Sequence, residues 1–424
     1  MRIDLLKIQN FNGLASCEIA FDPHFNLLVG DNGSGKTSVL DALTILLEGW
    51  VRGVDGDEKG GGISPDYIRV VPFAYADSPS FERQLPVRIE ATGLVQGSPL
   101  MWVRQRNRLR GGTSYVETKS IAEVAKSAAS AVRGGLSVTL PLIGSYGAGR
   151  LWDESPARRT RRKSEAKNGK PSRLDGYKDC LDFGIQETVL VDWIRAQVLD
   201  SFQSGTKTIA LQVAERAITA CVEGAKSLTY SAEEKELAFD LEPFGRQLLY
   251  NLSHGQRVMA TMIGELARRA TRLNPHLGEG VLENTPGVVL IDELDLHLHP
   301  KWQRRIIHDL KRTFPLVQFI ATTHSPQLIG EAPPSEIRIM ADGKAYTTDH
   351  SLGLDSSRIL EEIQGASRRS ASAESLIHKI AKAIDNDNFE DARRLVVGLE
   401  QMVGSDDSEV TRPRSLMRFM DAPQ

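Results

Sequence analysis

Four residues near the N-terminus have the types and the spacing of a phosphate-binding loop. Gly30, Gly35, Lys36 and Thr37 fit the pattern G-x-x-x-x-G-K-[ST], between an apolar run and a helical pattern. Glycines let successive N–H groups and a helix N-terminus point at one anion. We expect Lys36 to reach the β- and γ-phosphates and the Thr37 hydroxyl to bind Mg2+. The residues predicted to contact ATP here are Asn32, Gly33, Ser34, Gly35, Lys36, Thr37 and Ser38.

A second segment supplies the carboxylates that nucleotide hydrolysis needs. Residues 286–300 read Pro-Gly-Val-Val-Leu-Ile-Asp-Glu-Leu-Asp-Leu-His-Leu-His-Pro, an apolar strand ending in Asp292 and Glu293. We predict that Asp292 holds hydrated Mg2+ and that Glu293 orients or deprotonates the attacking water. Together with the glycine-rich loop, this pair favours hydrolysis over binding alone.

Two shorter motifs follow the same order along the chain as in one ATPase superfamily. Residues 251–257 read Asn-Leu-Ser-His-Gly-Gln-Arg, and residues 322–326 read Thr-Thr-His-Ser-Pro. Taken by itself, Ser253 is better explained as an ordinary helix cap. With the other motifs, the chain resembles the ABC-type ATPases, in which two heads pair head to tail. The resemblance implies that Ser253, Gly255 and Gln256 contact ATP held by a second copy, and that His324 senses the γ-phosphate.

The pattern departs from that superfamily at identifiable positions. His254 replaces the first glycine of the usual L-S-G-G-Q, which puts the fit of this loop against nucleotide in question. The glutamine expected after the strand at 136–144 is not evident, and Arg150 lies in about that place. His297 and His299 form an H-x-H that suggests either a metal site or a dimer-contact loop. We favour the contact loop because no third ligand presents itself.

The wider pattern indicates the fold class and a branch of the superfamily. We expect an α/β, ABC-type P-loop NTPase head with a mixed sheet, a helical insertion and a C-terminal helical hairpin. The predicted division is 1–150, 151–226, 227–348 and 349–424. The expected elements are strands within 1–29, 136–144 and near 228 and 238, helices at 37–47, 118–133, 187–202 and 209–224, a hairpin at 85–110 and a surface loop at 52–62.

Short sequence segments resemble particular subfamilies of this superfamily. The long globular insertion and the strand with Asn-Phe resemble the SMC/RecF/OLD-like members of the AAA family, although Asn12 stands where those proteins often carry a cation. Residues 145–152, 173–182 and 353–360 resemble the ATPase subunit of Septu-type anti-phage systems, also found in some retron systems. That resemblance implies a separate HNH nuclease as partner. The tail is too short for the Toprim nuclease of OLD-type relatives, and either docks a partner or covers its own core.

Charge and composition restrict which other functional classes the chain can belong to. The formal net charge is −3, so any nucleic-acid surface must be local. Arginines stand at alternate positions from Arg104 to Arg110 along one expected strand, and the segment from Arg158 to Arg173 is a basic loop. For both segments, contact with nucleic acid and a solvated surface remain open. We expect a cytoplasmic chain with no membrane partner. The alternatives are a RecF/SMC-like DNA-binding ATPase in DNA repair without a nuclease, a transporter subunit and a non-hydrolysing scaffold.

Overall fold

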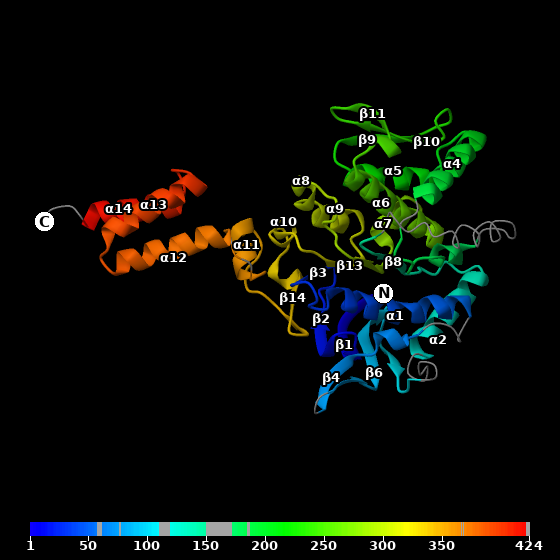
Figure 1. Ribbon diagram of the computed structural model, residues 1–424. Coiled ribbons are helices and arrows are strands. Elements are labelled where there is room, and N and C mark those ends of the chain that lie inside the picture. The colour runs from blue at the N-terminus through cyan, green and yellow to red at the C-terminus, as the bar shows by residue number, and fades with distance from the viewer. Residues whose placement is uncertain are drawn as a thin grey trace. The chain divides into compact units, whose positions relative to one another are not determined.

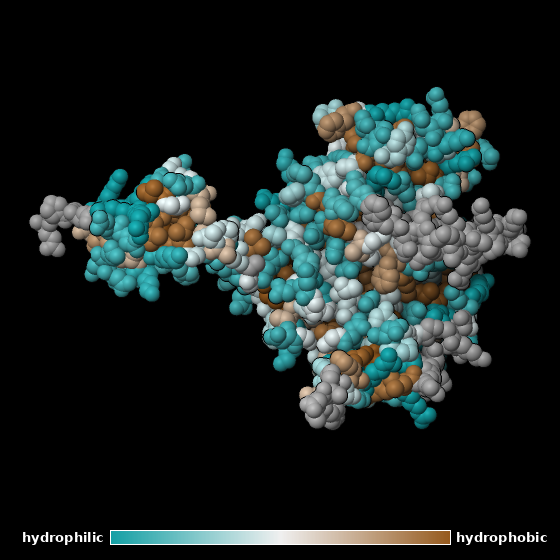
Figure 2. All heavy atoms as spheres, viewed as in Figure 1, coloured by the Kyte–Doolittle hydropathy of each residue, from teal (hydrophilic) through white to brown (hydrophobic). Residues whose placement is uncertain are grey.

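The computed structural model describes residues 1–56, 62–75, 78–109, 119–149, 172–184, 187–365, 367 and 369–420. The chain forms two compact units, Met1–Leu354 and Asp355–Gln424. Among the residues it describes, no helix is both long and apolar enough to cross a bilayer. On the face shown in Figure 2, hydrophilic residues predominate, and hydrophobic residues gather in smaller patches.

A six-stranded mixed sheet carries the nucleotide motifs (Figure 1). Its strand order is β15-β14-β3-β13-β12-β8, parallel except for β15. Every residue of β3, β8, β12 and β13 is buried, which explains their predominantly apolar sequences. The strands are β3 (Phe25–Val29), β8 (Leu142–Tyr146), β12 (Gly287–Ile291), β13 (Val317–Thr322), β14 (Ile337–Ala341) and β15 (Lys344–Tyr346). The mixed sheet was predicted correctly, but β8 begins at Leu142 rather than at Leu136, which is exposed.

A second, antiparallel sheet has the order β2-β1-β6-β7. Gln318 of β13 joins the two sheets, because its side chain bonds both the N–H and the carbonyl of Ile3. The strands are β1 (Arg2–Phe11), β2 (Leu14–Ala20), β6 (Val87–Val95) and β7 (Ser98–Arg106), and β4 (Val70–Tyr75) pairs separately with β5 (Ser78–Arg83). The strands expected in 1–29 and the hairpin in 85–110 are confirmed.

Helices α1 (Lys36–Asp55) and α2 (Lys119–Arg133) pack against each other beside this sheet. Helix α1 extends beyond the predicted end at Leu47 because Gly53 lets it lie directly on α2. A Cβ at Gly53 would come within 2.8 Å of the Ala122 Cα atom. The prediction of a loop from residue 52 is therefore wrong for 52–55, and residues 57–61 lie outside the described residues.

The insertion contributes helices to the lobe at the top of Figure 1, which also contains the strands β9, β10 and β11. It contains α4 (Glu187–Ser204) and α5 (Ile209–Cys221), close to their predicted bounds, followed by the sheet β11-β10-β9. The strands are β9 (Ala225–Ser231), β10 (Glu236–Leu241) and the unpredicted β11 (Gly245–Leu248). Helix α6 (His254–Leu273) packs on α5. The remaining short elements are η1 (Pro65–Tyr67), η3 (Leu249–Asn251), η4 (Pro275–Gly280), α7 (Val281–Asn284), α8 (Pro300–Gln303), α9 (Ile306–Thr313), α10 (Pro326–Ile329) and η5 (Pro334–Glu336).

Residues 172–184 run along the outer edge of β8, and we call them the edge segment. It begins with η2 (Arg173–Tyr177), and its carbonyls at Cys180 and Phe183 accept hydrogen bonds from the N–H groups of Ser145 and Gly147. Buried Arg269 of α6 donates to three of its carbonyls, at residues 176, 178 and 179. The edge segment therefore attaches α6 to the edge of the main sheet.

The C-terminal unit is a small helical domain with its own core. The predicted helical hairpin is formed by α12 (Ala371–Asp385) and α13 (Phe389–Val403), which pack their apolar residues against each other. Two helices were not predicted, α11 (Ser356–Glu362) and α14 (Ser408–Met420). Helix α14 buries Val410 and Met417 in the same core, although it contains Pro413.

Candidate nucleotide site

The phosphate loop lies between β3 and α1, and its glycines have conformations that other residues rarely adopt. Gly33 and Gly35 have φ of 81° and 99°. A Cβ at Gly35 would come within 2.7 Å of Leu14 Cδ2, so a side chain at this position would have to displace the end of Leu14. Gly35 is also the N-cap of α1 and cannot cap it with a side chain. The first N–H groups of a twenty-residue helix are thus available to an anion.

Lys36 lies over this loop with its ammonium held by main-chain oxygens. Its Nζ donates to the carbonyls of Gly30 at 2.7 Å and Asp31 at 2.8 Å. Only 7% of the residue is exposed, and burial lowers the pKa of its amino group, while nearby Asp292 acts in the opposite direction. A cation held at this position is placed to neutralise phosphate charge.

Asp292 and Glu293 follow β12 directly, and one hydroxyl from the neighbouring strand holds both. Thr322 Oγ1 donates to Asp292 Oδ1 at 2.6 Å and accepts from the Glu293 N–H at 2.7 Å. Glu293 has φ of 49°, which turns the chain away from the strand direction at the residue predicted to activate water. Asp41 of α1 lies close enough to Asp292 to be affected by its charge: burial, and then Asp292, raise the pKa of Asp41 to about 6.

The arrangement of Thr37 and Asp292 fits the predicted Mg2+ site. Thr37 Oγ1 and Asp292 Oδ2 lie 3.5 Å apart. Adjacent ligands of an octahedral Mg2+ with bonds of 2.0–2.1 Å are separated by about 3 Å. A hydroxyl and a carboxylate so placed suit two neighbouring positions of one ion, with water and phosphate oxygens as the other ligands.

His324 completes this pocket from the end of β13. The backbone N–H of His324 donates to Asp295 Oδ1 at 3.4 Å, and Thr323 Oγ1 donates to the same oxygen at 2.6 Å. A pocket of about 190 Å³ brings together most of the residues predicted to bind and hydrolyse ATP. It is lined by Asn32, Gly33, Gly35, Lys36, Thr37, Ser38, Asp292, Glu293, Thr322 and His324.

Ser253 and Gln256 lie elsewhere, at the start of α6. They form a capping box, in which the Gln256 N–H donates to Ser253 Oγ and the Ser253 N–H donates to Gln256 Oε1 at 3.0 Å. Ser253 therefore caps α6, and it remains exposed at the N-terminus of this helix. Both residues line an open groove with the loop 297–302. Gly255 is buried beneath this loop, where a Cβ would meet the His297 carbonyl oxygen.

The two histidines of the H-x-H make separate contacts. The His299 ring accepts the Lys301 N–H at 3.3 Å and so caps α8. The His297 ring meets the His254 ring edge-on, with centroids 4.2 Å apart. His254, the residue that departs from L-S-G-G-Q, therefore joins α6 to the loop after β12; we call α6 the signature helix because it begins in the Leu-Ser-His-Gly-Gln segment. Among the described residues, no group of three or more His, Cys, Asp or Glu is placed to hold a metal ion.

Two of the arginines proposed for nucleic-acid contact, Arg104 and Arg106, lie inside the protein. Arg104 and Arg106 share a strand face, as predicted, but that face is buried. Arg104 Nε donates to the Ile45 carbonyl of α1, and Arg106 donates to the carbonyls of Ile63 and Leu109. The suggested cationic surface at 104–110 is thus wrong for its first two members; Arg108 is exposed, and Arg110 lies outside the described residues.

In the second basic segment, Arg158 to Arg173, the prediction of a solvated loop is wrong for the last residue, Arg173. Arg173 donates to the carbonyls of Leu136, Val138 and Leu273, which makes it a structural link rather than part of a solvated loop. Residues 150–171, including Arg158 to Lys170 and the suggested Arg150, lie outside the described residues. Asn12, at the position of the usual cation, donates to Ser38 Oγ at 3.2 Å and so contacts the phosphate-loop helix.

Three site residues escaped the sequence interpretation. Thr322 bonds to the carboxylate of Asp292 and to the N–H of Glu293, and Asp295 holds the backbone N–H of His324. The third residue, Gln303, donates a hydrogen bond to the carbonyl of Asp295. Thr322 is the first residue of the segment Thr-Thr-His-Ser-Pro, and Asp295 lies two residues after Glu293, so their place in or next to the motifs was the available signal. Gln303 carries no such signal, because its role depends on the fold.

Two family models match separate parts of this chain. The family model described as "AAA ATPase domain" matches residues 1–56, and the one described as "AAA domain, putative AbiEii toxin, Type IV TA system" matches residues 207–330. Each covers less than half of the chain, and they contain the phosphate loop and the segment with Ser253, Asp292 and His324 respectively.

Two curated relatives and one solved structure are similar over larger regions. The "Retron Ec83 probable ATPase" of Escherichia coli is 34% identical over 215 residues, 49% of this chain but only 39% of the relative. The "Septu protein PtuA" of Bacillus thuringiensis is 25% identical over 400 residues, 91% of this chain and 90% of the relative. An SMC head bound to the C-winged helix domain of ScpA aligns with a TM-score of 0.49 at 16% identity, covering 83% of this chain and 99% of that one. Over these regions the chain is similar to AAA-type ATPases, to a retron ATPase and to a Septu protein.

Proposed function

We propose that this protein binds and hydrolyses ATP with Mg2+, closes as a head-to-tail dimer around the nucleotide, and thereby regulates a separate effector. One observation carries the proposal. The phosphate loop, Asp292, Glu293 and His324 line one pocket, whereas Ser253 and Gln256 of the same chain line a different groove. A second copy can supply those two residues to the γ-phosphate, as the superfamily resemblance implies.

Within each pocket the hydrolytic roles follow from the contacts. Thr37 and Asp292 would hold Mg2+, which neutralises phosphate charge when bound. Glu293 accepts a proton from water while the water oxygen forms a bond to the γ-phosphorus. The bond from that phosphorus to the β,γ-bridging oxygen breaks, and ADP and inorganic phosphate result. Lys36 and the N-terminus of α1 stabilise the negative charge that develops on the leaving group.

The effector is proposed to be a nuclease of the HNH type acting in anti-phage defence. The similarity to the Septu and retron relatives supports the defence setting. Hydrolysis would open the dimer and change the activity of this partner. Purification with the products of neighbouring genes, followed by native mass measurement, tests the partner. Recovery of the ATPase without any nuclease chain would favour a DNA-binding repair ATPase instead.

A mixing experiment tests the shared site. Lys36→Ala removes the phosphate-loop cation, and Ser253→Asp keeps the cap of α6 but places a negative charge toward the partner's γ-phosphate. Each variant alone should lack ATPase activity, whereas the mixture should regain part of it, because one of the two sites in a mixed dimer is intact. Ser370→Asp, at the N-cap of α12, is the matched control and should retain full activity. An inactive mixture, with both variants folded and associating, would contradict the shared site.

Glu293→Gln tests dimer closure directly. The variant should bind ATP but not release phosphate, and light scattering after gel filtration should show a dimer with ATP and Mg2+ that is absent with ADP. A monomeric mass despite measured ATP binding would rule out closure around nucleotide.

A further inference from the structure

One side-chain amide joins the loop after β12 to the segment that carries His324. Gln303, the last residue of α8, donates from Nε2 to the Leu298 carbonyl at 2.9 Å and to the Asp295 carbonyl at 3.3 Å. Its Oε1 accepts a hydrogen bond from Ser325 Oγ at 2.7 Å. Both ends of the amide are used, and the two carbonyl acceptors require the nitrogen to face the loop.

These contacts reach the residues on either side of His324. Ser325 follows it directly and is 6% exposed, and its hydroxyl also accepts the Leu328 N–H at the start of α10. Asp295 bonds to the His324 N–H and to Thr323 through its carboxylate, while its own carbonyl is held by Gln303. The His324 backbone is thus located from two directions, and Gln303 takes part in both.

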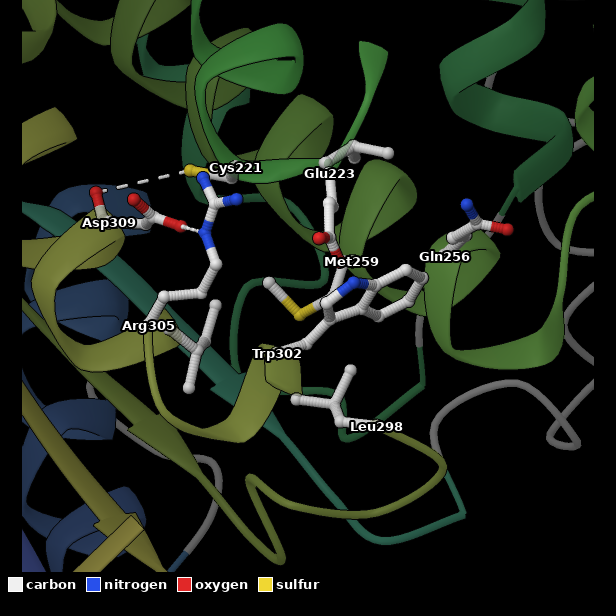
Figure 3. Close-up of a pocket in the computed structure, with 10 residues that line it drawn as sticks. Cys221, Glu223, Gln256, Met259, Leu298, Trp302, Arg305 and Asp309 are labelled. Atoms are coloured by element: carbon white, nitrogen blue, oxygen red, sulfur yellow. Dashed lines mark hydrogen bonds and ion pairs between the residues drawn. The ribbon is translucent and has the colours of Figure 1, made fainter. Parts of the chain in front are cut away.

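The same loop is attached to the signature helix α6. The His297 carbonyl lies where a Cβ on Gly255 would be, so backbone meets backbone at this point. Figure 3 shows Leu298 and Trp302 of the loop and α8 facing Met259 of α6, and these three residues line one small pocket. A shift of α6 relative to the sheet would therefore reach Gln303 through packed groups.

We propose that Gln303 is a positioning residue that holds His324 in place for the γ-phosphate and links its position to that of the signature helix. Gln303 does not line the nucleotide pocket, so its effect on hydrolysis passes through His324. In a dimer, the signature of this chain would contact the partner's nucleotide while His324 contacts its own. Gln303 would then connect the two ATP sites within one chain. The inference rests on the proposed function.

The test is a double-mutant cycle with His324. Gln303→Met keeps the length of the side chain and adds no charge, but removes all three hydrogen bonds. It should lower kcat for phosphate release by about tenfold or more, as for other residues that orient a functional group, and leave KM for ATP within about twofold. Starting from His324→Ala, the same substitution should cause no further loss, because the group it positions is already absent.

Two more variants separate positioning from general damage. Gln303→Glu keeps the acceptor for Ser325 and removes the donors to the loop, so it should show the same dependence on His324. Gln327→Met is the matched control, because Gln327 Oε1 lies 3.0 Å from Ser325 Oγ, farther than Gln303 Oε1 at 2.7 Å, and Gln327 contacts no carbonyl of the loop in the described hydrogen bonds. The single hydroxyl proton of Ser325 goes to the nearer acceptor, Gln303. This control should behave like the parent chain.

Each outcome either supports or overturns the positioning role of Gln303. An equal loss of kcat with and without His324, or a kcat within twofold of the parent for both Gln303 variants, overturns the positioning role while leaving the proposed ATPase function intact. Absence of phosphate release by the parent chain overturns the proposed function and, with it, this inference. Loss that depends on His324 in either folded Gln303 variant supports the role.

Discussion

Replacing Thr322 by valine is a sharp test of how the site is assembled. Thr322 is 1% exposed, and its hydroxyl is the group through which β13 holds both carboxylate positions after β12. Valine has nearly the same shape, so the substitution removes the two hydrogen bonds without opening a cavity. The bond to Asp292 involves an ionised acceptor and is short, which places it among the stronger hydrogen bonds in proteins.

The size of the effect follows from these two bonds. A hydrogen bond to a charged group contributes about 1.5–3 kcal/mol, and a buried N–H without its acceptor costs about 1–3 kcal/mol. If about 2 kcal/mol of this positioning is needed in the transition state, kcat falls about thirtyfold, at about 1.4 kcal/mol for each factor of ten. The apparent affinity for Mg2+ should fall as well, because Asp292 loses the partner that orients it.

The assay is steady-state phosphate release at several Mg2+ concentrations, with urea unfolding as the check on stability. Thr322→Ser retains the hydroxyl and should remain within about threefold of the parent, since only a methyl group is lost. A Thr322→Val protein with the kcat and Mg2+ dependence of the parent would refute the reasoning, because Asp292 and Glu293 would then be held without Thr322.

Three further predictions use other parts of the site and the scaffold. Lys36→Ala should abolish the rise in Tm that ATP and Mg2+ cause in the parent, and a retained rise would show that Lys36 is dispensable for binding. Burial, and then Asp292, raise the folded-state pKa of Asp41 to about 6, so the folded state is favoured by protonation as pH falls from about 6 to about 4. Asp41→Asn should therefore raise Tm more at pH 8 than at pH 5, and an equal change at both would exclude this titration. Arg269→Met should cost about 3–5 kcal/mol in urea unfolding, because it leaves buried polar partners behind, whereas Arg358→Met, in an exposed pair on α11, should cause no measurable change.

The motifs of the nucleotide pocket were predictable because their chemistry is local. Gly35, Lys36 and Thr37 are neighbours in sequence, and the turn that presents them depends on those residue types. The burial of β12 and β13 was visible in their predominantly apolar residues. The residues around Thr322 and Gln303 bring together segments that are distant in sequence, and no local pattern records such pairings.

The arginines of β7 show a different limit. Alternation correctly places Arg104 and Arg106 on one face of a strand, but it does not say whether that face meets solvent or α1. Both arginines lie on the buried face, where main-chain carbonyls accept their N–H groups. Sequence alone favoured a surface because charged side chains are rarely buried without partners. The partners here are supplied by α1 and by residues 63 and 109, which only the fold brings close.

The edge segment along β8 has a consequence for the solubility of the chain. A bare edge strand offers unpaired N–H and carbonyl groups to other polypeptides and invites aggregation by strand addition. The carbonyls of Cys180 and Phe183 occupy the N–H groups of Ser145 and Gly147 on that edge, and Arg269 anchors the segment that supplies them. Loss of the Arg269 contacts would expose the edge of β8, a buried strand, to pairing with strands of other molecules. The edge segment thus protects the main sheet against aggregation by strand addition, a process distinct from any ATP-dependent dimerisation.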